Sequence, residues 1–234
     1  MGMRYTLRVF KGMTQSQFRA KVEETAHAVG ATLLWAASGE RESYFSLSSN
    51  GDVHSAYLPY QDGDFSFFQN LGRTTGLPWI ELRIQEGALW DYTLFRGDQC
   101  MDTFSVCPQY WSDPPQATAI IFEGGTIKRF VFKVFGPRLY KDPEEKLRTW
   151  SGKPDVLASL WGLPRERIER YLVNWGFKID PDDEMTFEYT LTGRAYPDDE
   201  HDYGDYEQFF DVLRALGAVD PVDQHTLRLP KAAR

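Results

Sequence analysis

The chain lacks the features that place a protein in a membrane or in an oxidising compartment. It has no run of about 18 apolar residues, so we expect no transmembrane helix. Its two cysteines, Cys100 and Cys107, are spaced like neither a zinc site nor a CxxC redox pair. The first residues, MGMRYTLRVF, lack the charged and apolar regions of a signal peptide. These absences favour a reduced, cytoplasmic setting.

The common catalytic motifs are missing too. There is no G-x-S-x-G elbow, no P-loop and no G-x-G-x-x-G turn, and the four histidines lie apart from any serine or cysteine motif. We therefore expect no cofactor. The absences leave enzymatic activity open but favour a protein that acts by binding.

What the chain does contain is typical of a globular protein. Hydrophobic residues make up 42% of the 234 residues and aromatic residues 15%, which is enough to build a large aromatic core. Alternation in PWIELRIQ, residues 78–85, predicts a strand, and Asn50-Gly51 and Gly97-Asp98 predict hairpin turns. No helix-length segment separates the middle strands, so the sheet should be antiparallel.

Helical patterns follow Pro137, in PDVLASLWG, PRERIERYLVNWG and DYEQFFDVLRALG. The predicted fold is therefore α+β, mainly an antiparallel sheet, with helices concentrated in the C-terminal third. Residues 1–75 form a small α+β unit. Residues 76–234 form an antiparallel sheet followed by a helical segment and an acidic C-terminal region, and the two parts can also be one continuous domain.

Residues 157–172 have the rhythm of a helix-turn-helix. Arg165, Arg167 and Arg170 could then face phosphates. Glu166 and Glu169 interleave with these arginines, however, and the chain has a net charge of −8. DNA binding is therefore the third hypothesis, and nucleic acid is a disfavoured partner.

The negative charge is concentrated in one segment. Residues 180–211 hold 12 of the 34 acidic residues and one of the 26 basic ones, whereas the remainder has 22 acidic and 25 basic residues, a net of +3. Such a segment repels phosphate backbones and attracts a basic protein surface. The predicted partner-binding residues are Asp198, Asp199, Glu200, Asp202 and Asp205.

The same stretch, AYPDDEHDYGDYEQFF, carries the second hypothesis, a metal-assisted hydrolase. The ligands, if there are any, would be Asp198, Glu200, His201 and Asp202. A calcium loop starting at Asp198 would place Tyr203 where a glycine is needed and Phe209 where a glutamate is needed. No metal is therefore favoured, and the acids can instead cap the following helix, with Asp205 as its N-cap.

A secondary pocket is predicted around the second hairpin. Asp91 and Asp102 lie on paired strands, where they can approach each other as an acid/base pair or point into solvent. The candidates for this pocket are Trp90, Asp91, Tyr92, Asp102, Tyr110 and Trp111.

Two stretches carry a resemblance, LWDYTLFRGDQCMDTFSVCPQYW (89–111) and AYPDDEHDYGDYEQFFDVLRALG (195–217). With their W-x-Y-x-L hairpin, D-x-F…P-x-Y-W continuation and acidic Y-G-D-x-x-Q-F tail, they resemble a group of uncharacterised bacterial proteins. The resemblance implies a bacterial protein and transfers no catalytic residue. The leading hypothesis is a bacterial protein-binding module, of an immunity-like or regulatory kind, and the sequence does not specify its oligomeric state.

Overall fold

The computed structural model describes residues 5–36, 44–58, 64–85, 87–108, 147–179 and 187–229. The strands are β1 (Tyr5–Lys11), β2 (Thr32–Leu34), β3 (Tyr44–Asn50), β4 (Val53–Tyr57), β5 (Pro78–Gln85), β6 (Leu89–Arg96), β7 (Gln99–Ser105), β8 (Phe177–Ile179), β9 (Phe187–Tyr189) and β10 (Asp223–Arg228). The main helices are α1 (Gln15–Ala28), α2 (Asp64–Thr75), α6 (Pro154–Trp161) and α7 (Gln208–Ala215), with a 3-10 turn, η3, over Arg165–Arg167. The stretch IKRFVFKVF, residues 127–135, whose sequence predicts a further strand, lies outside these ranges, as do the pocket candidates Tyr110 and Trp111.

Eight strands form one antiparallel sheet in the order β2-β10-β3-β4-β1-β5-β6-β7. The α+β class and the antiparallel sheet are therefore confirmed. Strand β1 pairs with β4 on one side and β5 on the other, so the sheet crosses the boundary predicted between residues 75 and 76. Strand β10, close to the end of the chain, lies between β2 and β3. Strands β8 and β9 pair separately.

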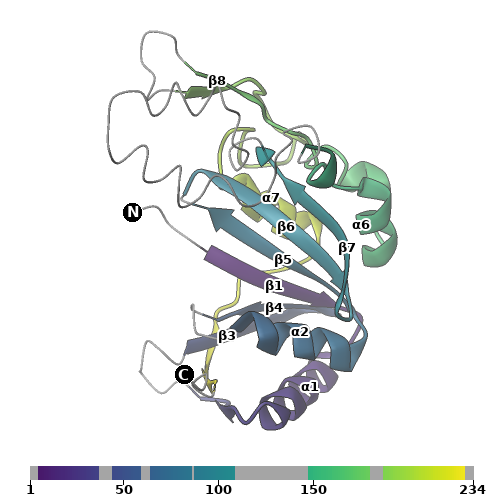
Figure 1. The fold of residues 1–234 in the computed structure, drawn as a ribbon, viewed down its shortest axis with the longest axis vertical. Helices are drawn as coiled ribbons and strands as arrows, with labels where there is room; N and C mark the ends of the chain where they lie inside the picture. Colours follow the sequence, from purple (N-terminus) through teal and green to yellow (C-terminus); the bar gives the residue numbers. More distant parts are fainter. Residues whose placement is uncertain are drawn as a thin grey trace.

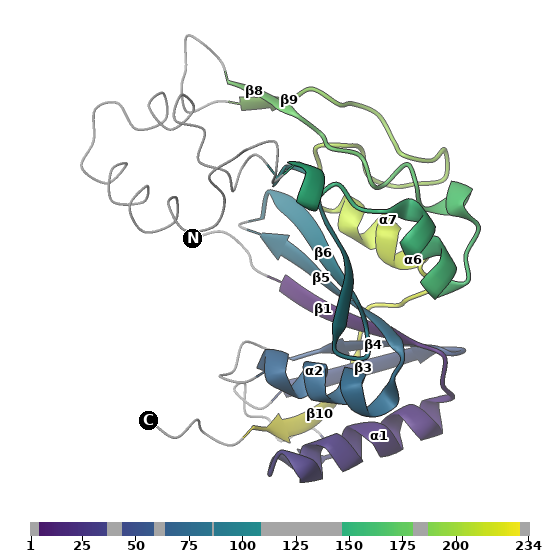
Figure 2. The ribbon, with the colours of Figure 1, turned by 45° about the vertical axis from the view of Figure 1, so that its right-hand side comes forward.

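The helices cover both faces of the sheet (Figures 1 and 2). Alternation along β1 sends Leu7 to the core shared with α6 and α7, and Phe10 to the core shared with α1 and α2. Each face thus has its own aromatic core, which contains Trp90 on the α6 and α7 side and Trp79 on the other. In the described part of the chain, no helix is long and apolar enough to cross a membrane.

The prediction that helices concentrate in the C-terminal third is wrong. Helices α1 and α2 are the longest of the four, with 14 and 12 residues, whereas α6 and α7 have eight each. One reason is that PRERIERYLVNWG forms no α-helix. Only Arg165–Arg167 is helical there, as η3, and Arg165 pairs with Asp155 and Glu169. The second helix of the helix-turn-helix hypothesis is therefore absent from this described segment.

Charged side chains cross the α1 and α2 side of the sheet in alternating sign. Arg8 donates to Glu81 at 3.0 Å, Glu81 accepts from Arg83 at 3.3 Å, and Arg83 reaches Asp91 at 2.5 Å. Burial raises the pKa of the Asp91 carboxyl, and the Arg83 guanidinium opposes that rise. The sequence allowed Asp91 to point into solvent, but Asp91 and its neighbour Glu81 are both buried. The ladder supplies each carboxylate with the cationic partner that a buried charge needs.

Gly72 lies inside α2, although glycine is a poor helix former and more often ends a helix. A Cβ added here would clash with the Trp79 indole nitrogen and would lie 2.6 Å from the Gly97 carbonyl oxygen. That nitrogen donates to the same carbonyl at 2.7 Å, so α2, β5 and the β6–β7 turn meet at this point. Glycine is required because there is no space for a side chain.

Gly72→Ala should therefore destabilise the protein by about 2 kcal/mol or more, although alanine favours a helix. Chemical denaturation measures the loss. The matched control is Thr74→Ala, an exposed position in the same turn, where helix propensity acts alone and stability should stay the same or rise slightly. Equal effects of the two substitutions would contradict the packing role of Gly72.

His54 makes the fold sensitive to acid. It is fully buried, stacks on Phe18 at 4.5 Å, and hydrogen-bonds the Ser49 hydroxyl and the Met13 carbonyl. Burial lowers the pKa of His54 because it disfavours the charged ring. Below the unfolded-state pKa of about 6.5, the unfolded chain binds a proton that the folded chain resists, so stability falls as the pH drops.

Between about pH 7.5 and about pH 5.5 the wild-type protein should lose about 1 kcal/mol more stability than His54→Gln. Urea unfolding at the two pH values measures this difference. His27→Gln, at an exposed position of α1, is the control and should retain the wild-type slope. If His54→Gln retains it as well, His54 is not the group responsible.

Candidate functional site

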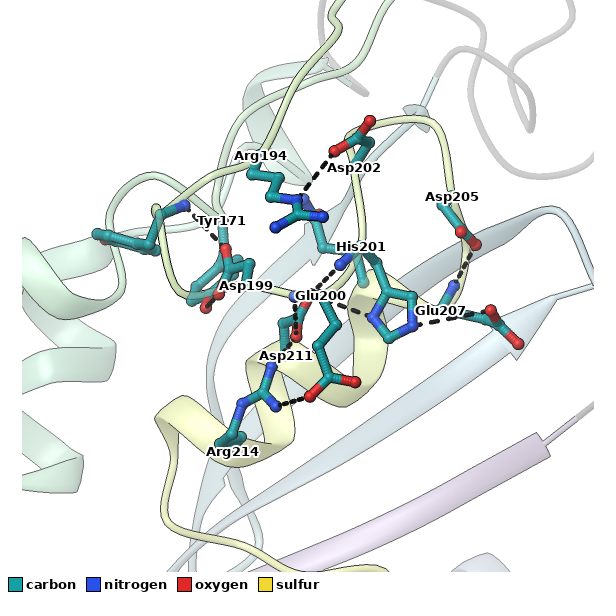
Figure 3. A network of polar contacts seen from close by, with 12 residues as sticks. Tyr171, Arg194, Asp199, Glu200, His201, Asp202, Asp205, Glu207, Asp211 and Arg214 are labelled. Atoms are coloured by element: carbon teal, nitrogen blue, oxygen red, sulfur yellow. Dashed lines mark hydrogen bonds and ion pairs between the residues drawn. The ribbon is translucent and has the colours of Figure 1, made fainter.

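The acidic stretch folds as an irregular loop over residues 194–207, here called the acidic loop, between β9 and α7 (Figure 3). Between Arg194 and Arg214 the chain has seven acidic and two basic residues, a net charge of −5. The carboxylates are not equivalent, because some are directed inward and hold the loop whereas others are exposed.

Asp211 is the main internal anchor. It is 1% exposed, on the first turn of α7, and accepts hydrogen bonds from the backbone nitrogens of Glu200 at 3.1 Å and His201 at 3.0 Å. The His201 ring lies 3.2 Å from the same carboxylate, and Arg214 also pairs with it. One carboxylate therefore fastens two consecutive backbone amides of the loop to the helix.

Asp199 is the second internal anchor. It is 5% exposed and accepts from the Tyr171 hydroxyl at 2.5 Å and the Tyr196 backbone nitrogen at 2.8 Å. Burial raises the pKa of the Tyr171 phenol, and the hydrogen bond to Asp199 adds to the rise. Asp199 is among the predicted partner-binding residues, and in the structure its carboxylate faces the interior.

The outer carboxylates are exposed. Glu200 pairs with Arg214 at 2.5 Å and Asp202 with Arg194 at 3.4 Å, both through side chains about half exposed or more. Asp198 is exposed and has no ion pair within the described residues. Exposed pairs of this kind contribute roughly 0–1 kcal/mol, so a partner's cations can displace them.

The residues of the metal hypothesis do not converge. Glu200 turns to Arg214 and Asp202 to Arg194, while the His201 ring lies between Asp211 and Glu207 (Figure 3). Across the described ranges, no group of three or more histidine, cysteine, aspartate or glutamate side chains is placed to hold a metal ion. Asp205 is not the N-cap either; α7 begins after Glu207, and Asp205 accepts from the Glu207 nitrogen at 2.8 Å.

A hollow of about 620 Å³ lies beside the acidic loop. Its walls include Tyr189, Tyr203, Tyr206 and Asp205, and we call it the tyrosine pocket. Tyr189 donates its hydroxyl to the Ala88 carbonyl at 3.1 Å. Tyr203 donates to the Arg170 carbonyl at 2.7 Å. These bonds fix two of the three rings in the wall.

Gly204 lets the loop approach the pocket wall. It has a φ of +89°, and an added Cβ would lie 2.8 Å from the Tyr189 ring. The tyrosines of this Y-G-D-Y segment were not predicted from the sequence, in which its acidic residues are the more conspicuous feature. The signal was the spacing of Tyr203 and Tyr206 around a glycine, which brings two rings to one side of a tight turn.

Of the six candidates for the secondary pocket, the four that the structure describes are buried side chains, and Tyr110 and Trp111 lie outside the described residues. Trp90 and Tyr92 are fully buried in the core shared with α6 and α7. Asp91 and Asp102 are also buried, on opposite faces of the sheet, so they neither form an acid/base pair nor point into solvent. Asp102 accepts hydrogen bonds from the Tyr92 hydroxyl and from the backbone nitrogen of Lys153, both at 2.7 Å. It therefore joins β7 to the start of α6.

Comparison of the chain with protein-family models, with curated proteins and with solved structures gives no significant match. The geometry of the acidic loop and the tyrosine pocket is therefore the basis for a proposed function.

The anchoring role of Asp211 can be tested by Asp211→Ala. Removing the carboxylate leaves two backbone amides and Arg214 without this acceptor, so we expect a loss of about 3 kcal/mol in stability. Hydrogen exchange of the Glu200 and His201 amides should accelerate most. Asp202→Ala, which removes only an exposed carboxylate, is the control and should change neither quantity appreciably. Unchanged exchange at both amides in Asp211→Ala would show that another group holds the loop.

Proposed function

We propose that this protein is a binding module that captures a basic protein through the acidic loop. The observation that carries the proposal is the separation of inner from outer carboxylates. The carboxylates of Asp199 and Asp211 are buried and accept hydrogen bonds from backbone nitrogens of the loop. Those of Asp198, Glu200 and Asp202 are exposed. The loop is therefore a negatively charged surface whose shape is held by its own buried hydrogen bonds.

Such a surface suits protein capture for two physical reasons. Fixed charges of one sign attract a surface of the opposite sign over about a Debye length, roughly 8 Å at physiological salt, and accelerate the encounter. A surface that is already ordered also loses less conformational entropy on binding than a flexible tail would. Both reasons fit an immunity-like or regulatory module of a bacterial cytoplasm, in which speed and selectivity matter.

Reversing three outer charges tests the proposal. The variant Asp198→Lys, Glu200→Lys, Asp202→Lys leaves both internal anchors in place. Proteins captured from a cell lysate by wild type and variant would be compared by quantitative mass spectrometry. The association rate of the captured protein, once purified, would then be measured at about 50 mM and about 300 mM salt. We expect a loss of about tenfold or more in rate at low salt and a flatter salt dependence.

The matched control changes the net charge equally but elsewhere. Asp52, Asp98 and Glu166 are exposed and lie outside the acidic loop. Their triple replacement by lysine should leave the capture and most of the salt dependence unchanged. If both triple variants bind like the wild type, or lose binding equally, the acidic loop is not the contact surface.

A further inference from the structure

The tyrosine pocket is lined by both aromatic rings and a carboxylate. Its volume of about 620 Å³ lies within the roughly 300–1,000 Å³ typical of ligand sites and exceeds what one side chain needs. The hydroxyls of Tyr189 and Tyr203 are already bonded to backbone carbonyls, so these two residues offer ring atoms to a ligand. Tyr206 makes no side-chain hydrogen bond to any described residue, so its hydroxyl is available too.

Asp205 supplies the charge of the pocket. One of its oxygens accepts from the Glu207 nitrogen at 2.8 Å, and within the described ranges no lysine, arginine or histidine pairs with it. It differs in this from Glu200 and Asp202, which have arginine partners. The backbone carbonyl of Arg170 accepts the hydrogen bond of Tyr203 in the pocket wall. The guanidinium of Arg170 does not pair with Asp205, because it lies over the Tyr196 ring and donates to the Ala195 carbonyl.

We infer that the tyrosine pocket binds the guanidinium group of an arginine side chain, presented by the basic partner of the proposed function. A guanidinium is planar and weakly hydrated, stacks on aromatic rings and donates hydrogen bonds to a carboxylate. In the pocket, the tyrosine rings can stack on a guanidinium and Asp205 can accept its hydrogen bonds. The inference rests on the proposed function for the source of the arginine, but not for the chemistry of the pocket.

Other ligand classes fit less well. An anion would meet the Asp205 carboxylate and the net charge of −5 between Arg194 and Arg214. A metal ion would find one carboxylate where several ligands are needed, since the described residues contain no cluster of three. An uncharged apolar group would desolvate Asp205 without giving it a partner.

The test is an amide-detected NMR titration with N-acetyl-arginine methylamide, using the full chain. The neutral isostere N-acetyl-citrulline methylamide and the lysine analogue are titrated in parallel. We expect the arginine compound to shift the Gly204, Asp205 and Tyr206 amides with a Kd on the order of 1 mM. Citrulline should bind at least about tenfold more weakly, because it lacks the charge. Lysine should bind more weakly than arginine, because its compact ammonium does not stack.

Three variants locate the binding. Asp205→Asn keeps an acceptor for the Glu207 nitrogen and should weaken arginine binding about tenfold. Tyr206→Leu should weaken it several-fold, whereas Tyr206→Phe, which keeps the ring, should weaken it less. The control is Asp202→Asn, which neutralises a loop carboxylate outside the pocket and should preserve the affinity. An amide spectrum that overlays on the wild type away from the pocket shows that each variant is folded.

Equal binding of arginine and citrulline, tighter binding of lysine, or equal losses in Asp205→Asn and Asp202→Asn would overturn the inference. These outcomes are distinct from failure of the proposed function. If the triple reversal of the outer charges abolishes protein capture but the pocket ignores arginine, only the pocket inference falls. If the pocket selects arginine but the triple reversal changes nothing, the acidic loop is not the capture surface.

Discussion

The geometry of the candidate site depends on one buried carboxylate, that of Asp211. An ionised group that is 1% exposed is costly unless several donors surround it. Asp211 meets this condition by collecting two loop amides, the His201 ring and Arg214. Because Asp211 is on α7, and Phe209 and Leu213 of that helix lie in the core against the sheet, the acidic loop is positioned relative to the rigid part of the fold. Rigid support of this kind makes a polar loop able to recognise a partner.

Local sequence signals predicted much of the fold, where short-range chemistry decides the structure. Asn50-Gly51 joins β3 to β4 as expected, and Thr14 caps α1 in a capping box with Gln17. The signals failed where packing decides. Gly72 would end an isolated helix, but in the fold it is the place where α2 touches β5 and the β6–β7 turn. The segment after Pro164 has a helical pattern, yet it makes only a 3-10 turn before the chain packs Ile168 and Tyr171 into the core.

The sequence also could not predict which charged residues are buried. Alternation along β5 puts Glu81 and Arg83 on one face, but the sequence could not reveal that this face is buried or that Asp91 of β6 lies on it. Only the three-dimensional register brings Arg8 opposite Glu81, and Arg83 opposite Asp91, so that the charges neutralise one another. In the acidic loop, likewise, Asp198 and Asp199 are adjacent and chemically identical, and yet one is exposed and the other buried. Composition identified the segment, whereas burial decides which carboxylates a partner can reach.

The two proposals assign different roles to neighbouring residues of the site, one in the rate of association and the other in the lifetime of the complex. Under the proposed function, exposed carboxylates such as Asp198 and Asp202 act at a distance, so they would govern how fast a basic partner arrives and how strongly salt slows its arrival. Under the pocket inference, Asp205 and the tyrosine rings act only in contact, so they would govern how long the partner stays bound. Gly204 joins the two regions, because its positive φ and its missing Cβ let the charged turn lie against Tyr189. Taken together, the two proposals would account for both fast capture and selective retention of a partner. A substitution that altered both rates equally would have disturbed the loop's internal anchors rather than its contact surface.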